Sequence, residues 1–409
     1  MDRGVEAVPQ AGAAGPVRAT AAAFSAVLVG IGLARFGYTP LIPALIAAHW
    51  FTPAASVLLG AANLAGYLFG ALGARAIARR VGVATALKAM MGLTAASFFA
   101  CAFPLGFAWF FPWRVVSGLT GGGLMALAAP AVLPHLPPPR RGIAGGAIFC
   151  GVGLGIAASG TLVPLLITRG LTATWLGFGL IALALTALSW SGWPPALPDQ
   201  DRGRLARIMI CGRDARGPSS GAGRALRALY LEYALNAVGL VPHMIFFVDF
   251  IARGLGQGLA AGARYWVLFG IGALLGPLLA GYLGDRIGFR TALRLAFVIE
   301  AVAVALPLAS VGAPALVLSS LVVGASVPGI VALVSGRTRE LVPDDPHGQA
   351  AAWSLCTTAF ALGMALAAYG FAALYAHNEN SYALLFALAA AALLVALAVD
   401  LGAARGARR

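Results

Sequence analysis

The sequence predicts an all-α membrane protein with twelve transmembrane helices in two pseudo-symmetric bundles of six. Three observations predict this fold class. The 409-residue chain is 60% hydrophobic and only 10% charged, with a mean hydropathy of +0.88, whereas a soluble domain carries roughly 25% charged residues. Its apolar runs are long enough to cross a bilayer, which takes about 20 residues per helix. One long polar stretch, 194–225, divides these runs into two sets of six.

The apolar runs are bounded by Pro, Gly or Arg clusters and follow one another at short intervals. The expected spans are 20–47, 53–76, 83–104, 108–135, 142–168, 172–193, 226–250, 262–284, 291–311, 314–335, 348–374 and 381–401. They place the first bundle at 19–193 and the second at 226–402. Residues 1–18 and 403–409 are then short tails, and 194–225 is a linker.

The basic residues predict the orientation of the chain. Of the 28 Lys and Arg, three fall in loops on one side (Arg169, Arg253 and Arg264), two fall inside spans (Arg35 and Arg114), and the other 23 fall on the side of both termini. Since basic loops stay in the cytoplasm, we expect a bacterial inner-membrane protein with cytoplasmic termini. This retention also explains the net charge of +14 without nucleic-acid binding, because the arginines lie between apolar runs.

The two halves share a short pattern. Gly142 and Cys150 repeat as Gly348 and Cys356, 206 positions later, and both pairs open the fifth helix of a half. The same offset brings the two sets of six helices into register, as expected of a duplicated six-helix unit.

The chain lacks the motifs of soluble catalysis. It has no P-loop, no G-x-S-x-G and no H-E-x-x-H, and its four cysteines show neither a disulfide framework nor metal-ligand spacing. We therefore expect no enzymatic activity, no metal or other cofactor, and no ATP drive.

The loop between the eighth and ninth spans carries the most specific motif. Its residues are Gly281, Gly284, Asp285, Arg286, Gly288 and Arg290. Glycines permit close helix approach and a tight turn, and an aspartate can cap a helix and pair with an arginine. The loop after the second span repeats Gly70 and Arg75 but has Ala74 in place of the aspartate. The spacing resembles the loop motif of the major facilitator superfamily (MFS), and we expect a conformational latch here.

Two further segments extend the resemblance over essentially the whole chain. Arg114, Gly118 and Gly122 resemble the superfamily's fourth-helix motif, R-x-x-x-G-x-x-x-G. The string from Arg35 to Pro40, Arg-Phe-Gly-Tyr-Thr-Pro, resembles the YbfB/YjiJ-type branch. The resemblance implies a secondary transporter of twelve helices in two bundles and brings no substrate with it.

The arginines inside spans are candidate substrate ligands. A guanidinium in hydrocarbon costs roughly 2.5 kcal/mol or more, so Arg35, near mid-membrane, and Arg114 are expected to face a wet cavity, together with Tyr38. The alternatives are an interhelical salt bridge for Arg35 and an outward-reaching side chain for Arg114.

The seventh span carries a polar stripe. Glu232, Asn236, Gly239 and His243 share one helical face, which is typical of a cavity-lining helix. Asn236 and His243 are candidate substrate ligands. Histidine titrates near physiological pH and a desolvated glutamate can do so, so Glu232 and His243 are candidates for proton coupling. Glu300, in the ninth span, has no evident partner.

Mid-membrane arginines with few nearby acids favour a small organic anion as substrate. We expect a monomer in the lipid bilayer that works by alternating access with proton coupling. A proton-driven exporter of drugs or metabolites is one alternative, and a membrane sensor or enzyme without a transport cycle is another.

Overall fold

The computed structural model describes residues 15–195, 220–343, 346–378 and 381–406, and every regular element in these ranges is a helix. Twelve helical segments are long and apolar enough to cross a membrane, which confirms the predicted fold class. Most of the predicted tails and linker (1–18, 194–225 and 403–409) lies outside the described residues. Where these segments are described, α1 begins at Pro16, α9 begins at Ser220 and α15 ends at Gly406, so the helices extend beyond their predicted limits.

The first bundle contains six spans, and the first of these is irregular. The elements are α1 (Pro16–Val27), the π-helix η1 (Leu28–Leu33), the 3-10 helix η2 (Phe36–Leu41), α2 (Ile42–Ala47), α3 (Pro53–Val81), α4 (Val83–Ala100), α5 (Phe107–Val132) with the short η3 (Leu133–His135), α6 (Pro138–Ile167) and α7 (Leu171–Ser189).

The second bundle repeats this order, again with an irregular first span. The elements are α9 (Ser220–Val241), the π-helix η4 (Pro242–Phe246), α10 (Phe247–Asp249), the π-helix η5 (Phe250–Gly254), α11 (Leu259–Ile287), α12 (Phe289–Ala309), α13 (Ala313–Leu341), α14 (Pro346–His377) and α15 (Tyr382–Gly406).

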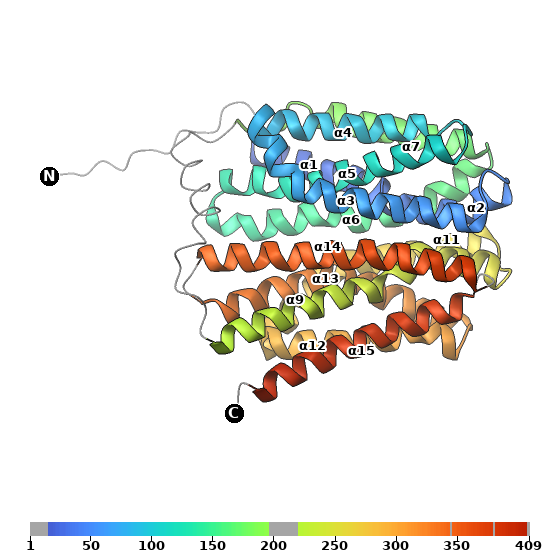
Figure 1. Ribbon diagram of the computed structural model, residues 1–409. Helices are drawn as coiled ribbons and strands as arrows, with labels where there is room; N and C mark the ends of the chain where they lie inside the picture. The colour runs from blue at the N-terminus through green and yellow to red at the C-terminus, as the bar shows by residue number, and fades with distance from the viewer. Residues whose placement is uncertain (1–14, 196–219, 344–345, 379–380, 407–409) are drawn as a thin grey trace.

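Helix packing is equivalent in the two bundles. In the first, α5 packs against α3 and α4; in the second, α13 packs against α11 and α12. The bundles meet where α3 contacts α14 and where α6 contacts α11. In Figure 1 the first bundle lies above the second, and the described ends of the chain lie at the same end of the molecule.

Close contacts of glycines show the repeat between the two bundles at the level of single residues. Gly66 of α3 lies against the backbone of Val115 in α5, and Gly272 of α11 lies against the backbone of Leu321 in α13. Positions 66 and 272 differ by 206, as do 115 and 321. The same offset relates two further contacts, Gly70–Leu119 with Gly276–Ala325, and Gly118–Asn63 with Gly324–Phe269. Because glycine lets two backbones approach closely, α3 and α5 cross in the first bundle in the same way as α11 and α13 cross in the second.

The contact between α6 and α11 loosens toward the end that holds the described termini. Gly146, Gly153 and Gly160 lie on one face of α6 at seven-residue spacing. A Cβ atom at Gly153 or Gly160 would meet backbone atoms of α11, whereas one at Gly146 would meet nothing within 4 Å. The interface between α6 and α11 is therefore tight in its middle and far parts and open near the termini.

Candidate functional site

The first span is interrupted beside Arg35. Between η1 and η2, Ala34 and Arg35 form a turn, and Pro40 lies inside η2, where it cannot donate a backbone hydrogen bond. In the turn, the carbonyl oxygen of Ala34 accepts hydrogen bonds from Arg114 Nη1 at 3.1 Å and from Ser117 Oγ at 3.4 Å. Side chains of α5 thus satisfy the backbone that the interruption frees, and Arg35 projects from this point.

Arg35 lies at the junction of the two bundles. Its guanidinium carbon is 5.0 Å from the ring centroids of both Phe36 and Tyr67, within the range of cation–π attraction. Its Nη2 faces the sulfur atoms of Met244, at 3.7 Å, and Met364, at 2.6 Å. Both methionines belong to the second bundle, and Nε has no hydrogen-bond partner. Arg35 therefore makes no salt bridge to a described residue.

Arg114 is enclosed by protein. It is 1% exposed, which rules out a side chain reaching the outer surface, and its guanidinium carbon lies 4.1 Å from the centroid of the Tyr38 ring. Its Nη1 donates to the carbonyl oxygen of Ala34, whereas its Nε and Nη2 have no hydrogen-bond partner. Arg114 thus braces the interrupted helix and still offers two unused donors.

Both arginines line one small central cavity, together with Tyr38, Asn63 and Met244. Its volume is about 10 Å³, roughly what a single water molecule requires. On the side away from the termini, Thr39 Oγ1 donates to the carbonyl oxygen of Met244 at 2.5 Å. The cavity is therefore occluded, and this hydrogen bond connects the two bundles on its outer side.

The first bundle provides no anion for these arginines. Residues 15–195 contain no Asp or Glu. The ion pairs among the described residues all lie in the second bundle and involve other arginines. Two guanidiniums, the strongest fixed cations in proteins, thus face an occluded cavity without a described carboxylate partner.

The polar stripe of the seventh span does not reach this cavity. Asn236 Nδ2 donates to Glu300 Oε2 at 2.7 Å, and His243 Nε2 lies 2.8 Å from Ser319 Oγ. All four side chains are fully buried, and the hydrogen-bond partners of Asn236 and His243 lie in α12 and α13 inside the second bundle. The structure therefore differs from the expectation that Asn236 and His243 line a cavity with the arginines.

Glu232, the remaining stripe residue, lies in the middle of α9, one helical turn closer to the termini than Asn236. It is 2% exposed, and the charged groups that act on it are Asp400, Arg290, Arg294 and Arg337. Glu232 is not among the residues that line the central cavity.

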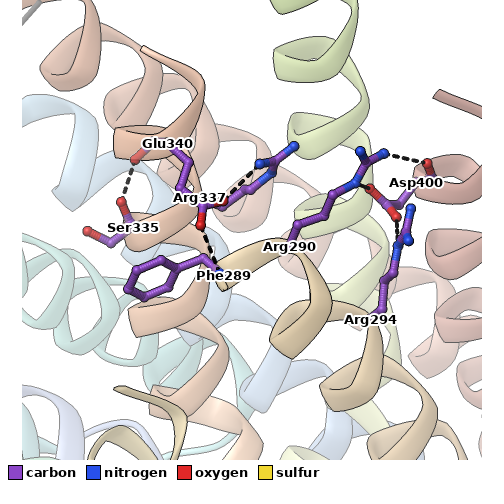
Figure 2. Close-up of polar contacts among 8 residues, drawn as sticks. Phe289, Arg290, Arg294, Ser335, Arg337, Glu340 and Asp400 are labelled. Atoms are coloured by element: carbon purple, nitrogen blue, oxygen red, sulfur yellow. Dashed lines mark hydrogen bonds and ion pairs between the residues drawn. The ribbon is translucent and has the colours of Figure 1, made fainter. Parts of the chain in front are cut away.

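The expected latch forms a different set of contacts. Glu340 of α13, rather than Asp285, caps α12: the Phe289 backbone N–H donates to Glu340 Oε1 at 2.9 Å, and Arg337 Nη1 lies 2.8 Å from Glu340 Oε2 (Figure 2). Gly288 has φ +79°, the left-handed conformation that a glycine adopts without strain. Asp285 itself is exposed.

Arg290 and Arg294 both pair with Asp400 of α15 (Figure 2). Arg286 stacks on Tyr282, and Arg75 is exposed in the equivalent loop of the first bundle. In the described part of the chain, the ion pairs of Arg290, Arg294 and Arg337 connect residues of the second bundle only, so none of them bridges the two bundles in this conformation. Of the motif glycines, Gly70 packs on α5 and Gly284 packs on the Phe289 ring, whereas a Cβ atom at Gly281 would meet nothing within 4 Å.

A second, larger cavity opens between the bundles at the end away from the termini. Its volume is about 610 Å³, and the loops before α7 and α11 line it together with Arg169 and Arg253. Arg253 Nη1 lies 3.4 Å from Asp249 Oδ1, and the buried Asp249 also accepts hydrogen bonds from Tyr382, at 2.6 Å, and Tyr375, at 3.3 Å. We call this cavity the outer vestibule.

Comparison with known proteins identifies the family. The family model described as "Uncharacterised MFS-type transporter YbfB" matches residues 27–401. The chain belongs to this family. A comparison with curated proteins gives no significant match. Members of this family are transporters rather than enzymes, so the chain is a multi-pass membrane protein that carries a small molecule across the bilayer.

Solved structures of MFS transporters share the fold at low sequence identity. A D-xylose-proton symporter matches with a TM-score of 0.72 and 18% identity, over 93% of this chain and 97% of that one. A mutant form of the nucleoside transporter NupG matches with a TM-score of 0.73 and 12% identity, over 95% and 99%. The xylose transporter XylE from E. coli, in a partially occluded inward-open conformation, matches with a TM-score of 0.70 and 17% identity, over 93% and 96%.

Several residues of the site escaped the sequence reasoning. Asn63 was visible as a lone amide in an apolar run, and its Nδ2 lies 3.3 Å from Ser117 Oγ. Met244, Met364 and Tyr67 carried no signal, because apolar and aromatic residues are ordinary in a membrane helix.

Proposed function

We propose that this protein is a secondary transporter that moves a small organic anion by alternating access, with Arg35 and Arg114 binding the anionic group. The observation that carries the proposal is the pair of guanidiniums at an occluded central cavity, with unused N–H donors and no described carboxylate partner. An unpaired charge in a low-dielectric interior costs several kcal/mol. A bound carboxylate removes much of that cost, because its two oxygens match the N–H fork of a guanidinium.

The position of Arg35 supports alternating access. Its sulfur contacts and the Thr39–Met244 hydrogen bond cross from one bundle to the other. Tilting of the bundles would break these contacts and open the cavity, while Arg35 stays with the first bundle. The separation of α6 and α11 near the termini supports assignment of this conformation to an occluded state close to inward opening.

The outer vestibule supports an anionic substrate independently. Arg169 is exposed in it, no acidic residue is among its lining residues, and the N-termini of α7 and α11 open onto it. Arginines and helix N-termini attract anions. The vestibule would therefore raise the local concentration of substrate.

Proton coupling is part of the proposal. Carrying a negative charge inward against a negative-inside potential costs about 2.3 kcal/mol per 100 mV, so inward accumulation of an anion requires co-transport of cations. One of the solved structures with the same fold is that of a D-xylose-proton symporter. The proposed setting is a monomer in the bacterial inner membrane with both termini cytoplasmic, in accord with the basic loops.

Counterflow in proteoliposomes tests this function. Vesicles preloaded with one carboxylate are diluted into the radiolabelled form, and other carboxylates compete alongside their uncharged amides. We expect carboxylates to compete and the matched amides to fail. Equal competition by acids and amides, or preference for organic cations, would overturn the anion assignment.

A further inference from the structure

A buried carboxyl–amide pair lies in the second bundle, away from the proposed anion site. Glu300 in the middle of α12 and Asn236 in α9 are both 0% exposed. Asn236 Nδ2 donates to Glu300 Oε2 at 2.7 Å. The other two oxygens, Glu300 Oε1 and Asn236 Oδ1, are buried without a hydrogen-bond partner. Two adjacent side chains thus each keep one unsatisfied acceptor.

No cation compensates Glu300 among the described residues. From α9, Glu232 lies one turn before Asn236, and His243 lies two turns after it, where it contacts Ser319 of α13. The charged groups of α13, and Asp285 and Arg286 of α11, lie at the terminus-side ends of their helices, whereas Arg264 of α11 is exposed near the opposite end. Asp400 of α15 is held by Arg290 and Arg294. Asn236 is the one polar group that acts on Glu300.

We propose that Glu300 and Asn236 form the proton-binding site of the transport cycle. A neutral carboxyl has one O–H donor, whereas an ionised one has none. With the proton on Oε1, Glu300 can donate to Asn236 Oδ1 while Asn236 Nδ2 donates to Oε2. One proton then satisfies both unpartnered acceptors. This inference rests on the proposed transport function and specifies which group carries its coupling proton.

The pair is connected to the anion site through a single helix. Asn236 lies in α9, which continues without a break into the π-helix η4. There Met244 faces Arg35 through its sulfur and accepts the hydrogen bond from Thr39. Loss of the proton leaves a charged carboxylate in the bundle interior, where it requires water or a cation. Any movement of α9 that admits water to Glu300 also moves the cavity wall formed by η4.

The test uses Glu300→Gln, which keeps the shape and hydrogen bonding of the protonated side chain but cannot release a proton. In proteoliposomes that hold a carboxylate found by counterflow, we expect this variant to retain exchange within about twofold and to lose accumulation driven by a pH gradient by at least tenfold. Glu6→Gln, the same change in the N-terminal tail outside the twelve spans, should keep both activities. Gradient-driven accumulation by Glu300→Gln at the wild-type level would overturn the inference.

The two proposals fail in different ways. If wild-type protein exchanges no anion, the proposed function fails. If it exchanges and accumulates anions and Glu300→Gln does so equally, only the proton site is wrong. Should Glu300→Gln not fold, Asn236→Ala keeps the carboxyl and removes its one described partner. The midpoint of uptake against external pH should then move by about one unit, and an unmoved midpoint overturns the inference.

Discussion

Replacement of Arg35 separates a binding role from a structural one. Truncating one partner of a buried, hydrogen-bonded charge pair costs about 2–5 kcal/mol in affinity. Because Arg114 lines the same cavity and can hold part of the anion, we expect about 3 kcal/mol for Arg35→Gln, which is roughly a 150-fold rise in Kd. Arg35→Lys keeps the charge but loses the planar fork and the stacking on Phe36 and Tyr67, so its Kd should rise about tenfold.

The same substitution should act on stability in the opposite direction. In the empty protein Arg35 is a guanidinium whose polar contacts are two methionine sulfurs, and removing an uncompensated charge is often neutral or stabilising. The Tm of ligand-free Arg35→Gln in detergent should therefore equal or exceed that of wild type, while carboxylate binding weakens. Arg264→Gln, at an exposed position of α11, is the matched control. Wild-type affinity in folded Arg35→Gln, or a fall in its ligand-free Tm, would refute this account.

Three further substitutions probe the frame around the site. Gly118→Ala forces a Cβ atom into the α3 backbone and should destabilise the protein by about 1–3 kcal/mol, which is measured as a lower Tm. The control Gly146→Ala has open space around its Cβ atom and should not lower the Tm. Asp400→Asn leaves two arginines without their carboxylate and should destabilise by about 1 kcal/mol, between an exposed and a buried ion pair; Asp285→Asn, at an exposed site, should leave Tm within one degree. Tyr382→Phe removes the 2.6 Å hydrogen bond to a buried carboxylate and should cost about 1.5–3 kcal/mol, with an unchanged Tm counting against that bond.

The fold could be predicted from the sequence because its cause is local. A helix that must satisfy its own backbone in lipid needs a long apolar run, and each of the twelve runs is visible without knowledge of the others. The ends of the helices were predicted less exactly. For example, α13 continues to Leu341, six residues past the expected end of its span, because a helix need not stop where its apolar run ends. In the sequence, the 206-residue offset was visible only at one glycine and one cysteine. In the structure, the same offset relates the glycine contacts between crossing helices of the two bundles.

The site was predictable in part. Arg35, Tyr38 and Arg114 line one cavity, since charge inside a membrane span is rare enough to mark function. Helical periodicity placed Asn236 and His243 correctly on one face, but it contains no information about which helix covers that face. The partner of Glu300 lies 64 positions away, and only the packing of α9 against α12 brings the two together.

The first spans of the two bundles share a mechanical property. Each is a regular α-helix on the terminus side and changes farther along to short stretches that include π- or 3-10 helix, at 28–41 and at 242–254. Backbone of mixed pitch bends more easily than an uninterrupted α-helix, because fewer hydrogen bonds must be exchanged when the angle changes. The two irregular segments contact each other through Thr39 and Met244. We therefore expect the outer side to open by bending of these two segments while the rest of each bundle stays rigid. Spin labels placed after the irregular segments should then move farther than labels placed before them.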